Sequence, residues 1–323
     1  MKICIVGAGA IGCWIGAKLA VPGAHEVSVL ARGATLGALQ QHGWRLETAQ
    51  GFVQAPIHKA SSETADLGEQ DLIVIAVKSQ SLAEVAPTLA PLIGKNTLIM
   101  PAMNGVPWWF MQTIWDKPLL SIDPAGHIQS ALPADQVIGC VVHASTSSPS
   151  PGVAKHHGGQ KLIVGEPSGG QSERVENLLK ALSGGGFEAV HSQDIRHHIW
   201  YKLWGNMTMN PISAITGATI DRVLGDELVR RFCSSVMLEA QAIGARIGCK
   251  IDETPEDRHA VTAKLGAFKT SMLQDVEAGR AIELDAIVGA VREIGERLEM
   301  RTPNIDALLG LARLMGKSKN IYH

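Results

Sequence analysis

The sequence has little of several features, and each shortage narrows its class. Its 29 Lys and Arg do not exceed its 31 Asp and Glu, so 323 residues carry a formal net charge of −2. Without a basic surplus to neutralise phosphates, we expect no nucleic-acid partner and no membrane-surface partner. The five cysteines are scattered, odd in number and without a C-x-x-C pair. This pattern argues against a disulfide framework or a zinc site and favours a reducing cytoplasm.

Long hydrophobic runs are also missing, because no apolar stretch reaches the roughly 20 residues of a membrane-spanning helix. Lys2 and the uncharged run after it have the composition of a secretory signal, but the glycine spacing inside that run argues against one. Metal-ligand spacing is absent as well. The pairs His156-His157 and His197-His198 are adjacent, and neighbours in a strand point to opposite faces. We therefore expect no metal site.

What the N-terminus does contain is a G-x-G-x-x-G motif, directly after an apolar run at residues 2–6 and before a helix-like stretch. A second strand is expected at residues 26–31. In a dinucleotide-binding βαβ unit these glycines allow a tight turn, close approach to a pyrophosphate and close helix–strand packing. The alternative is a glycine-rich turn without a ligand. The residues predicted to contact a cofactor here are Gly7, Ala8, Gly9, Ala10, Ile11 and Gly12.

The end of the second predicted strand indicates which cofactor is used. An NAD enzyme usually places Asp or Glu there to bind the ribose 2′-hydroxyl. This sequence has Arg32 and no acidic residue close to it in the chain. A guanidinium suits a 2′-phosphate, so the sequence predicts NADP(H). The alternative for Arg32 is a solvated loop charge.

The rest of the first half continues the α/β pattern. Strands are expected at residues 71–77, 96–100, 136–143 and 187–191, a hairpin at 153–157 and 161–164, and a helix at 172–182. Open α/β sheets bind ligands beyond the carboxyl ends of their strands. Three polar residues follow such strand ends and are predicted to lie near the site: Lys78, Asn104 and Ser145.

After residue 193 the sequence has only helical periodicity. Helices are expected at residues 194–210, 226–248, 256–278, 283–300 and 303–316, with Thr302-Pro303 as an N-cap followed by proline at the first helical position. The predicted fold is therefore α/β, with a Rossmann-like dinucleotide-binding domain followed by an all-α C-terminal domain. We place the boundary near Ser192, so that residues 1–192 form the NADP-binding domain and residues 193–323 the helical substrate and catalytic domain.

The first helix of this second half carries an unusual polar stripe. Lys202, Asn206 and Asn210 recur at i, i+4 and i+8 among apolar and aromatic residues. Polar groups on an apolar helix cost desolvation unless they meet partners, which is typical of a site. The alternative is that Lys202 extends to solvent and the asparagines bond locally.

Two further polar groups stand nearer the C-terminus. Ser271 and Asp275 are four residues apart on one predicted helix, and Glu283 and Asp285 are expected in the first turn of the next. Acidic residues in a first turn can simply complement the helix dipole, and an isolated serine commonly bonds to solvent or backbone. From the residues alone these simpler interpretations are preferred.

Taken in order, these motifs resemble the ketopantoate reductase (2-dehydropantoate 2-reductase) family over essentially the whole chain. The matching residues are M-K-I-C-I-V-G-A-G-A-I-G, Arg32, A-V-K78, N104-G105, I-R-x-x-I-W-x-K202-L-x-x-N206-x-x-x-N210-P, S271-M-L-Q-D275 and E283-L-D. The resemblance implies NADPH-dependent reduction of a 2-oxo acid to a 2-hydroxy acid, a step of pantothenate biosynthesis. It also implies a cleft between a Rossmann-like domain and a helical domain.

The resemblance implies a role for each matching residue. Lys202 would be the catalytic proton donor, and Glu283 would bond the reacting hydroxyl and lie near the cofactor. Asn104, also near the cofactor, and Ser271 would hold the substrate. Asn206 and Asn210 would line its pocket, while Arg32 and Lys78 would meet the 2′-phosphate.

Departures from the family pattern leave the substrate open. Val288 replaces a common asparagine and Phe268 a common polar residue, and the aromatic run Trp108-Trp109-Phe110 is not general in the family. Rings lining the cleft would suit a larger 2-oxo acid than ketopantoate; the alternative is that they cover the core of the first domain. A related 3-hydroxy-acid dehydrogenase and a non-catalytic NADPH-binding sensor also stay open, as does a homodimer formed through the helical domain.

Overall fold

The computed structural model describes residues 1–322, and the chain divides into two compact units. The first unit contains Met1–Met103 and Gly126–His198, and the second contains Asn104–Ala125 and Ile199–His323. The expected boundary at Ser192 lies close to the division after His198. Residues 104–125 differ from the expectation, because they group with the helical unit although the sequence order places them between strands of the first.

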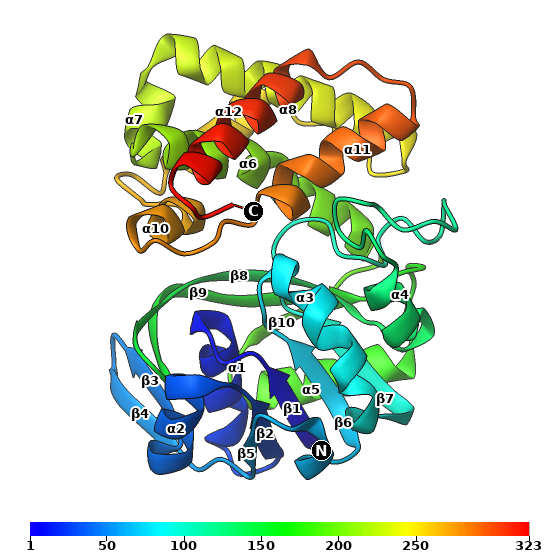
Figure 1. Ribbon diagram of the computed structural model, residues 1–323, viewed down its shortest axis with the longest axis vertical. Helices are drawn as coiled ribbons and strands as arrows, with labels where there is room; N and C mark the ends of the chain where they lie inside the picture. Colours follow the sequence, from blue (N-terminus) through cyan, green and yellow to red (C-terminus); the bar gives the residue numbers. More distant parts are fainter. Residues whose placement is uncertain (323) are drawn as a thin grey trace. The chain divides into compact units, whose positions relative to one another are not determined.

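A five-stranded sheet forms the centre of the first unit (Figure 1), in the order β5-β2-β1-β6-β7 with every neighbouring pair parallel. Buried residues fill the strands, as expected of a parallel sheet covered on both faces. This confirms the predicted dinucleotide-binding α/β fold. The strands are β1 Lys2–Val6, β2 Glu26–Leu30, β5 Ala60–Ser61, β6 Gln70–Ile75 and β7 Ile93–Pro101.

Helices connect these strands and pack against them. Trp14 of α1 is fully buried and meets Phe187 edge to face, with ring centroids 4.9 Å apart. This contact anchors the helix that follows the glycine motif. The helices of the unit are α1 Ala10–Ala20, α2 Gly33–His42, α3 Ser79–Val85, α4 His127–Ala131 and α5 Glu173–Gly184, with short turns η1 Thr64–Asp66, η2 Ala86–Leu92 and η3 Ala134–Gln136.

A second sheet has the order β10-β9-β3-β4, with β8 paired to β9. Its strands are β3 Trp44–Thr48, β4 Gly51–Ala55, β8 Gly139–Ser150, β9 Val153–Gly165 and β10 Glu188–His191. The hairpin expected within residues 153–164 is wrong, because β9 runs unbroken through Gly158 and Gly159. The antiparallel hairpin is instead formed by β8 and β9, and the chain turns just before Val153.

The helical unit is built around α6 Ile195–Thr216, which buries Trp200, Leu203 and Trp204. The indole of Trp204 donates to Met237 O at 2.8 Å, which fixes α6 against α8. The other helices are α7 Ile220–Gly225, α8 Glu227–Arg246, α9 Pro255–Ala263, α10 Ser271–Glu277, η4 Asp285–Gly289, α11 Ala290–Arg297 and α12 Pro303–Ser318. Within residues 1–322, no helix combines the length and apolar character needed to cross a membrane.

The aromatic run at residues 108–110 belongs to the core of this helical unit. Trp108, Trp109 and Phe110 are all buried, and Phe110 stacks on Trp200 with ring centroids 6.0 Å apart. The expectation that these rings cover the core of the first domain is therefore wrong, because residues 104–125 belong to the helical unit. That they line the substrate pocket stays a prediction.

Two predicted helices also differ from the expectation. Residues 256–278 form α9 and α10 with an irregular stretch between them, and residues 285–289 form one π-helical turn before α11. Pro303 begins α12 as expected, but the Thr302 hydroxyl does not cap it. The Glu239 carboxylate instead accepts from the Asn304 and Ile305 backbone amides at 3.0 and 2.9 Å.

Candidate functional site

The glycine motif occupies the turn between β1 and α1, and each glycine meets a different steric demand. Gly7 has φ +93°, a left-handed conformation that favours glycine. A Cβ on Gly12 would lie only 1.9 Å from Gly7 O, so close packing of helix and strand requires glycine there. A Cβ on Gly9 would meet nothing within 4 Å. Open space beside the second glycine is what backbone approach to a pyrophosphate requires.

The same turn presents the N-terminus of α1. Gly9 is its N-cap residue and, because it has no side chain, it cannot cap the amides of the first turn. The first amides of an α-helix have no partner inside the helix and, with the helix dipole, favour an anion. Open space, a helix of 11 residues and an N-terminus without a side-chain cap fit the diphosphate of a dinucleotide. Residues Gly7 to Gly12 would hold it.

Arg32 and Lys78 follow the two strands that flank β1. Because β2 and β6 both pair with β1 in parallel, their carboxyl ends meet at one edge of the sheet. Arg32 and Lys78 occupy the N-cap positions of α2 and α3 at this edge. The topology therefore brings two cations beside the glycine turn, as the sequence predicted.

The structure adds an acidic residue to this edge. Arg32 Nη1 lies 3.0 Å from Glu84 Oε1, and both side chains are largely exposed. The sequence analysis missed Glu84 because it lies 52 residues from Arg32. Only the three-dimensional structure reveals the pair, because β2 and β6 both flank β1 and bring the residues that follow them to one edge of the sheet.

Ser145 does not stand at a strand end. Strand β8 continues past it to Ser150, and its register against β9 shifts on both sides of Ser145. The expectation that residues 143–145 follow a strand of the nucleotide-binding sheet is thus wrong. The physical reason is that Thr146 to Ser150 continue to pair with β9, so β8 extends beyond Ser145 without a turn.

In the helical unit, the stripe on α6 is reached by the segment after Met103. Lys202 Nζ donates to Asn104 Oδ1 at 2.9 Å, although the two residues are 98 positions apart. Both side chains are half-buried. The ammonium is thus partly desolvated and is held by a charge-assisted hydrogen bond. This contact joins two residues that the sequence predicted separately.

Asn206 and Asn210 follow Lys202 along α6 at one-turn intervals. Asn206 is half-buried and Asn210 buried, so the stripe leads from the partly open Lys202 into the helical core. The flanking Leu203 and Met207 are buried. The predicted helix and its polar stripe are therefore present, while roles for the two asparagines stay predictions.

Asn104 is placed by its neighbour. Gly105 has φ +83°, and a Cβ there would lie 2.5 Å from Ala286 O. The next residue, Val106, donates its amide to that same Ala286 O at 2.8 Å. Glycine thus lets this segment touch the π-helical turn at residues 285–289, and the contact holds Asn104 in reach of Lys202.

Glu283 lies half-buried in the segment between α10 and this π turn, just before the helix rather than within its first turn. Ser271 is exposed at the first position of α10, where Thr270 supplies the cap. Asp275 is largely buried and pairs with Arg280, with Oδ1 2.9 Å from Nε. Asp275 therefore holds the chain after α10, which is a structural role.

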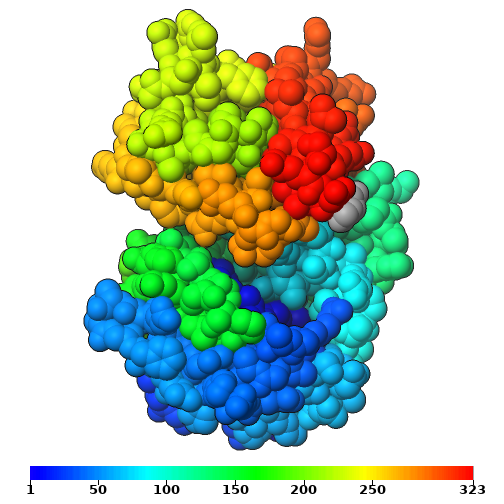
Figure 2. All heavy atoms as spheres, turned by 60° about the vertical axis from the view of Figure 1, so that its left-hand side comes forward, coloured from blue at the N-terminus to red at the C-terminus, as the bar shows by residue number. Residues whose placement is uncertain are grey.

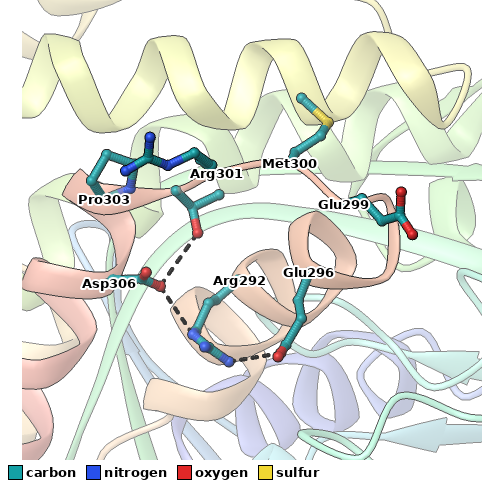
Figure 3. A pocket seen from close by; sticks show the side chains of 8 residues that line it. Arg292, Glu296, Glu299, Met300, Arg301, Pro303 and Asp306 are labelled. Atoms are coloured by element: carbon teal, nitrogen blue, oxygen red, sulfur yellow. Dashed lines mark hydrogen bonds and ion pairs between the residues drawn. The ribbon is translucent and has the colours of Figure 1, made fainter.

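A polar hollow lies elsewhere in the helical unit, between α11 and α12 (Figure 3). Arg292 lies between Glu296 and Asp306, at 2.9 Å from each carboxylate, and Arg301 and Glu299 stand at the rim. Cationic and anionic side chains alternate around this hollow, so it favours neither an anionic nor a cationic ligand. None of the predicted site residues line it. Within residues 1–322, no cluster of three or more His, Cys, Asp or Glu has the arrangement of a metal site.

The glycine turn at the end of a parallel sheet defines the class of the protein: it is a nicotinamide dinucleotide-dependent oxidoreductase with a separate helical unit. Family models cover both parts of the chain. Residues 3–169 match the model described as ketopantoate reductase PanE/ApbA, and residues 194–316 match its C-terminal model. The chain belongs to the ketopantoate reductase family.

Individual relatives agree with this. The chain is 41% identical to a 2-dehydropantoate 2-reductase from Mesorhizobium japonicum over 326 residues, which covers 100% of both chains. A crystal structure from Ralstonia solanacearum, provisionally assigned as a ketopantoate reductase, shares 49% identity and a TM-score of 0.96 over 99% of each chain. The 2-dehydropantoate 2-reductase from Methylococcus capsulatus gives 26% identity and a TM-score of 0.85, covering 99% of this chain and 98% of that one.

The different surroundings of Gly9 and Gly12 yield a prediction. We expect Gly12→Ala to destabilise the protein by about 1–3 kcal/mol or more, because its Cβ would overlap backbone. Gly9→Ala should leave stability unchanged, since φ −76° suits alanine, yet weaken NADPH binding about tenfold or more by filling the approach to the diphosphate. Thermal unfolding and NADPH fluorescence titration measure the two effects. Equal NADPH affinity of wild type and Gly9→Ala would contradict this placement of the cofactor.

Proposed function

We propose that this protein reduces 2-dehydropantoate to pantoate with NADPH, with Lys202 as the proton donor. The observation that carries the proposal is the half-buried Lys202 ammonium, held 2.9 Å from Asn104 Oδ1 and flanked by buried Leu203. Membership of the ketopantoate reductase family and the 41% identity to a 2-dehydropantoate 2-reductase support the reaction.

The chemistry explains why an ammonium is needed. Bound NADPH supplies the hydride for the ketone carbon. As the carbonyl oxygen gains negative charge, the Lys202 ammonium stabilises it by a charge-assisted hydrogen bond and then donates the proton that completes the hydroxyl. Asn104 accepts a hydrogen bond from the Lys202 ammonium and so helps to fix the direction of that side chain.

The remaining site residues are given roles on the same basis. Glu283 accepts from the reacting hydroxyl and, with Asn104, lies near the cofactor. Ser271 bonds the substrate carboxylate, and Asn206 and Asn210 line the pocket. Ser145 is kept as a cofactor contact, supported only by the bulge in β8 that turns this residue out of the regular register.

The preference for NADPH over NADH rests on Arg32 and Lys78. Both stand at the edge of the sheet beside the glycine turn, where a 2′-phosphate would add two charges or nearly two. A guanidinium binds such a group through paired hydrogen bonds. Glu84 opposes the binding of a 2′-phosphate, because its carboxylate is paired with the Arg32 guanidinium and repels an anion.

Burial of the aromatic run supports 2-dehydropantoate over a larger 2-oxo acid. Trp108 and Trp109 are nearly inaccessible, and Val288 lies fully buried in the π turn. These residues distinguish the chain from the family pattern but contribute to packing. Phe268, which is half-buried, is the remaining departure that can affect the pocket.

The first functional prediction concerns the proton donor. Lys202→Met keeps the apolar stem and removes the ammonium, so kcat for 2-dehydropantoate should fall about 10²–10⁴-fold, or roughly 3–5 kcal/mol of barrier. NADPH oxidation followed at 340 nm measures this, with ketopantoate and bulkier 2-oxo acids as substrates.

The matched control is Lys264→Met, which removes an exposed lysine of the same unit and should retain wild-type kcat. NADPH affinity should be the same in all three proteins. A Lys202→Met enzyme within tenfold of wild type would refute Lys202 as the donor. Wild-type turnover of only a bulkier acid would keep the mechanism and change the substrate.

The cofactor prediction uses two substitutions of opposite sign. Arg32→Ala should weaken NADPH binding about 10–100-fold, because a charge-assisted hydrogen bond is lost, and leave NADH binding nearly unchanged. Glu84→Gln should tighten NADPH binding a few-fold at low salt and lose that gain as salt screens the exposed charges. Fluorescence titrations with both cofactors test this. Parallel changes for NADPH and NADH would show that Arg32 does not contact the 2′-phosphate.

Oligomeric state and location complete the proposal. We propose a homodimer formed through α8 and α12, which pack together and carry the exposed leucines Leu228, Leu238, Leu311 and Leu314. Light scattering after size exclusion should give a dimer mass, and Leu311→Glu with Leu314→Glu should give a monomer. Val21→Glu, an exposed apolar position of the first unit, is the control. A monomeric wild type would contradict the dimer.

We also propose a cytoplasmic location, supported by five buried cysteines outside any disulfide, and no nucleic-acid partner.

A further inference from the structure

The C-terminal residues turn back onto the helical unit after α12. Asn320 adopts φ +54°, which reverses the chain, and Ile321 donates its amide to Gly316 O at 2.9 Å. Gly316 is required at this point, because a Cβ there would lie 2.6 Å from Tyr322 Cβ. The reversal resembles other left-handed helix ends, but here it continues into a further contact.

That contact brackets Glu283. Ile282 donates its amide to Ile321 O at 3.1 Å, and the Tyr322 hydroxyl donates to Asp285 Oδ1 at 2.7 Å. In Figure 1 the chain after α12 (red) runs back toward the segment that follows α10 (orange), and red atoms lie against orange ones in Figure 2. Glu283 thus lies between two residues that the tail holds.

The segment is also held by side-chain burial. Ile282, Leu284 and Ile321 are buried, whereas Glu283 is half-buried. The backbone of 280–283 has no helix or strand of its own. Its position therefore depends on contacts from other elements, of which the tail supplies two.

Asp285 begins the π turn that supports the other part of the site. In this turn Ala286 O accepts from Val106, and Gly105 packs against it. The Asp285 side chain thus lies one residue from the contact that places Asn104 beside Lys202. A π turn inside a helix is rare and frequently marks a functional position.

We propose that Tyr322 is a positioning residue for the reductase site: its hydrogen bond to Asp285 fixes the π turn that carries Glu283 on one side and supports Asn104 on the other. The inference deepens the proposed function and rests on the roles given there to Glu283 and Lys202. It places part of the active-site geometry under the control of the last residues of the chain.

The electrostatics of the pair provide a specific signature. Burial raises the pKa of Asp285, while the Tyr322 hydroxyl and the Arg313 guanidinium act to lower it. Burial and the Asp285 carboxylate raise the pKa of Tyr322 to about 12, so the hydroxyl remains a donor at all ordinary pH values. Removing the hydroxyl leaves Asp285 with Arg313 as its remaining charge partner on α12. The carboxylate then takes up a proton at higher pH than in wild type.

The experiment compares kcat from pH 5 to 9 for wild type, Tyr322→Phe, Asp285→Asn and the double variant. Tyr322→Phe should lower kcat about 3–30-fold and move the acid limb of the profile to higher pH. Asp285→Asn should remove that limb, and adding Tyr322→Phe to it should cause no further loss. NADPH affinity should not change, because the glycine turn lies in the other unit.

Ser318→Ala is the matched control, since it removes a hydroxyl from the same end of α12 that bonds only locally, to Met315 O. It should behave as wild type. A Tyr322→Phe enzyme with wild-type kcat and profile overturns the proposal. So does a lower kcat with an unshifted acid limb, because loss of folded protein alone produces that result.

Hydrogen exchange separates this proposal from the proposed function. The Ile282 amide is bonded to the tail, so exchange across residues 282–286 should quicken in Tyr322→Phe and not in Ser318→Ala. If the wild type reduces no 2-oxo acid, the proposed reaction fails while this measurement still decides whether Tyr322 holds the segment. Unchanged exchange in Tyr322→Phe overturns the positioning role whatever the substrate.

Discussion

The backbone contact between Gly105 and Ala286 is the constraint on which the catalytic half of the molecule depends. It requires a residue without a side chain and with φ +83°, so only glycine fits without displacing the π turn. Through this contact the segment 104–125 leaves the nucleotide-binding unit and becomes part of the helical one. The Lys202–Asn104 hydrogen bond follows from it, because Asn104 has no regular element to hold it in place.

In the first unit, the arrangement of the strands brings charged residues to the glycine turn. Parallel pairing of β2 and β6 with β1 brings the ends of three strands together, so residues 7, 32 and 78 meet although the sequence separates them widely. The same arrangement brings Glu84 to Arg32. An exposed ion pair of this kind contributes little stability. Under the proposed function, the pair therefore acts on the affinity of Arg32 for a phosphorylated ribose rather than on the stability of the fold.

Local patterns in the sequence were sufficient for the fold class and for the elements that carry the glycine motif and the polar stripe. The glycine spacing after an apolar strand predicted the dinucleotide turn, and the four-residue spacing of Lys202, Asn206 and Asn210 predicted a stripe on one helix. Both signals lie within one element. Features that depend on pairing between distant segments were missed, such as the continuous β9 and the extension of β8 past Ser145. Glycines at 158 and 159 looked like a turn, but β9 continues through them: Gly158 pairs with Ser145 of β8, and Gly159 has φ +70° where the register shifts.

The position of the aromatic run shows how the same limit affects the interpretation of the substrate. From sequence, Trp108 and Trp109 after Asn104-Gly105 suggested either a pocket wall or cover for the nearer domain. The second interpretation is wrong, because residues 104–125 belong to the helical unit, where Phe110 stacks on Trp200 of α6. Trp108 and Trp109 are buried as well, so packing accounts for the size of these side chains. Of the departures from the family pattern, Trp108, Trp109 and Val288 are buried, whereas Phe268 is half-buried.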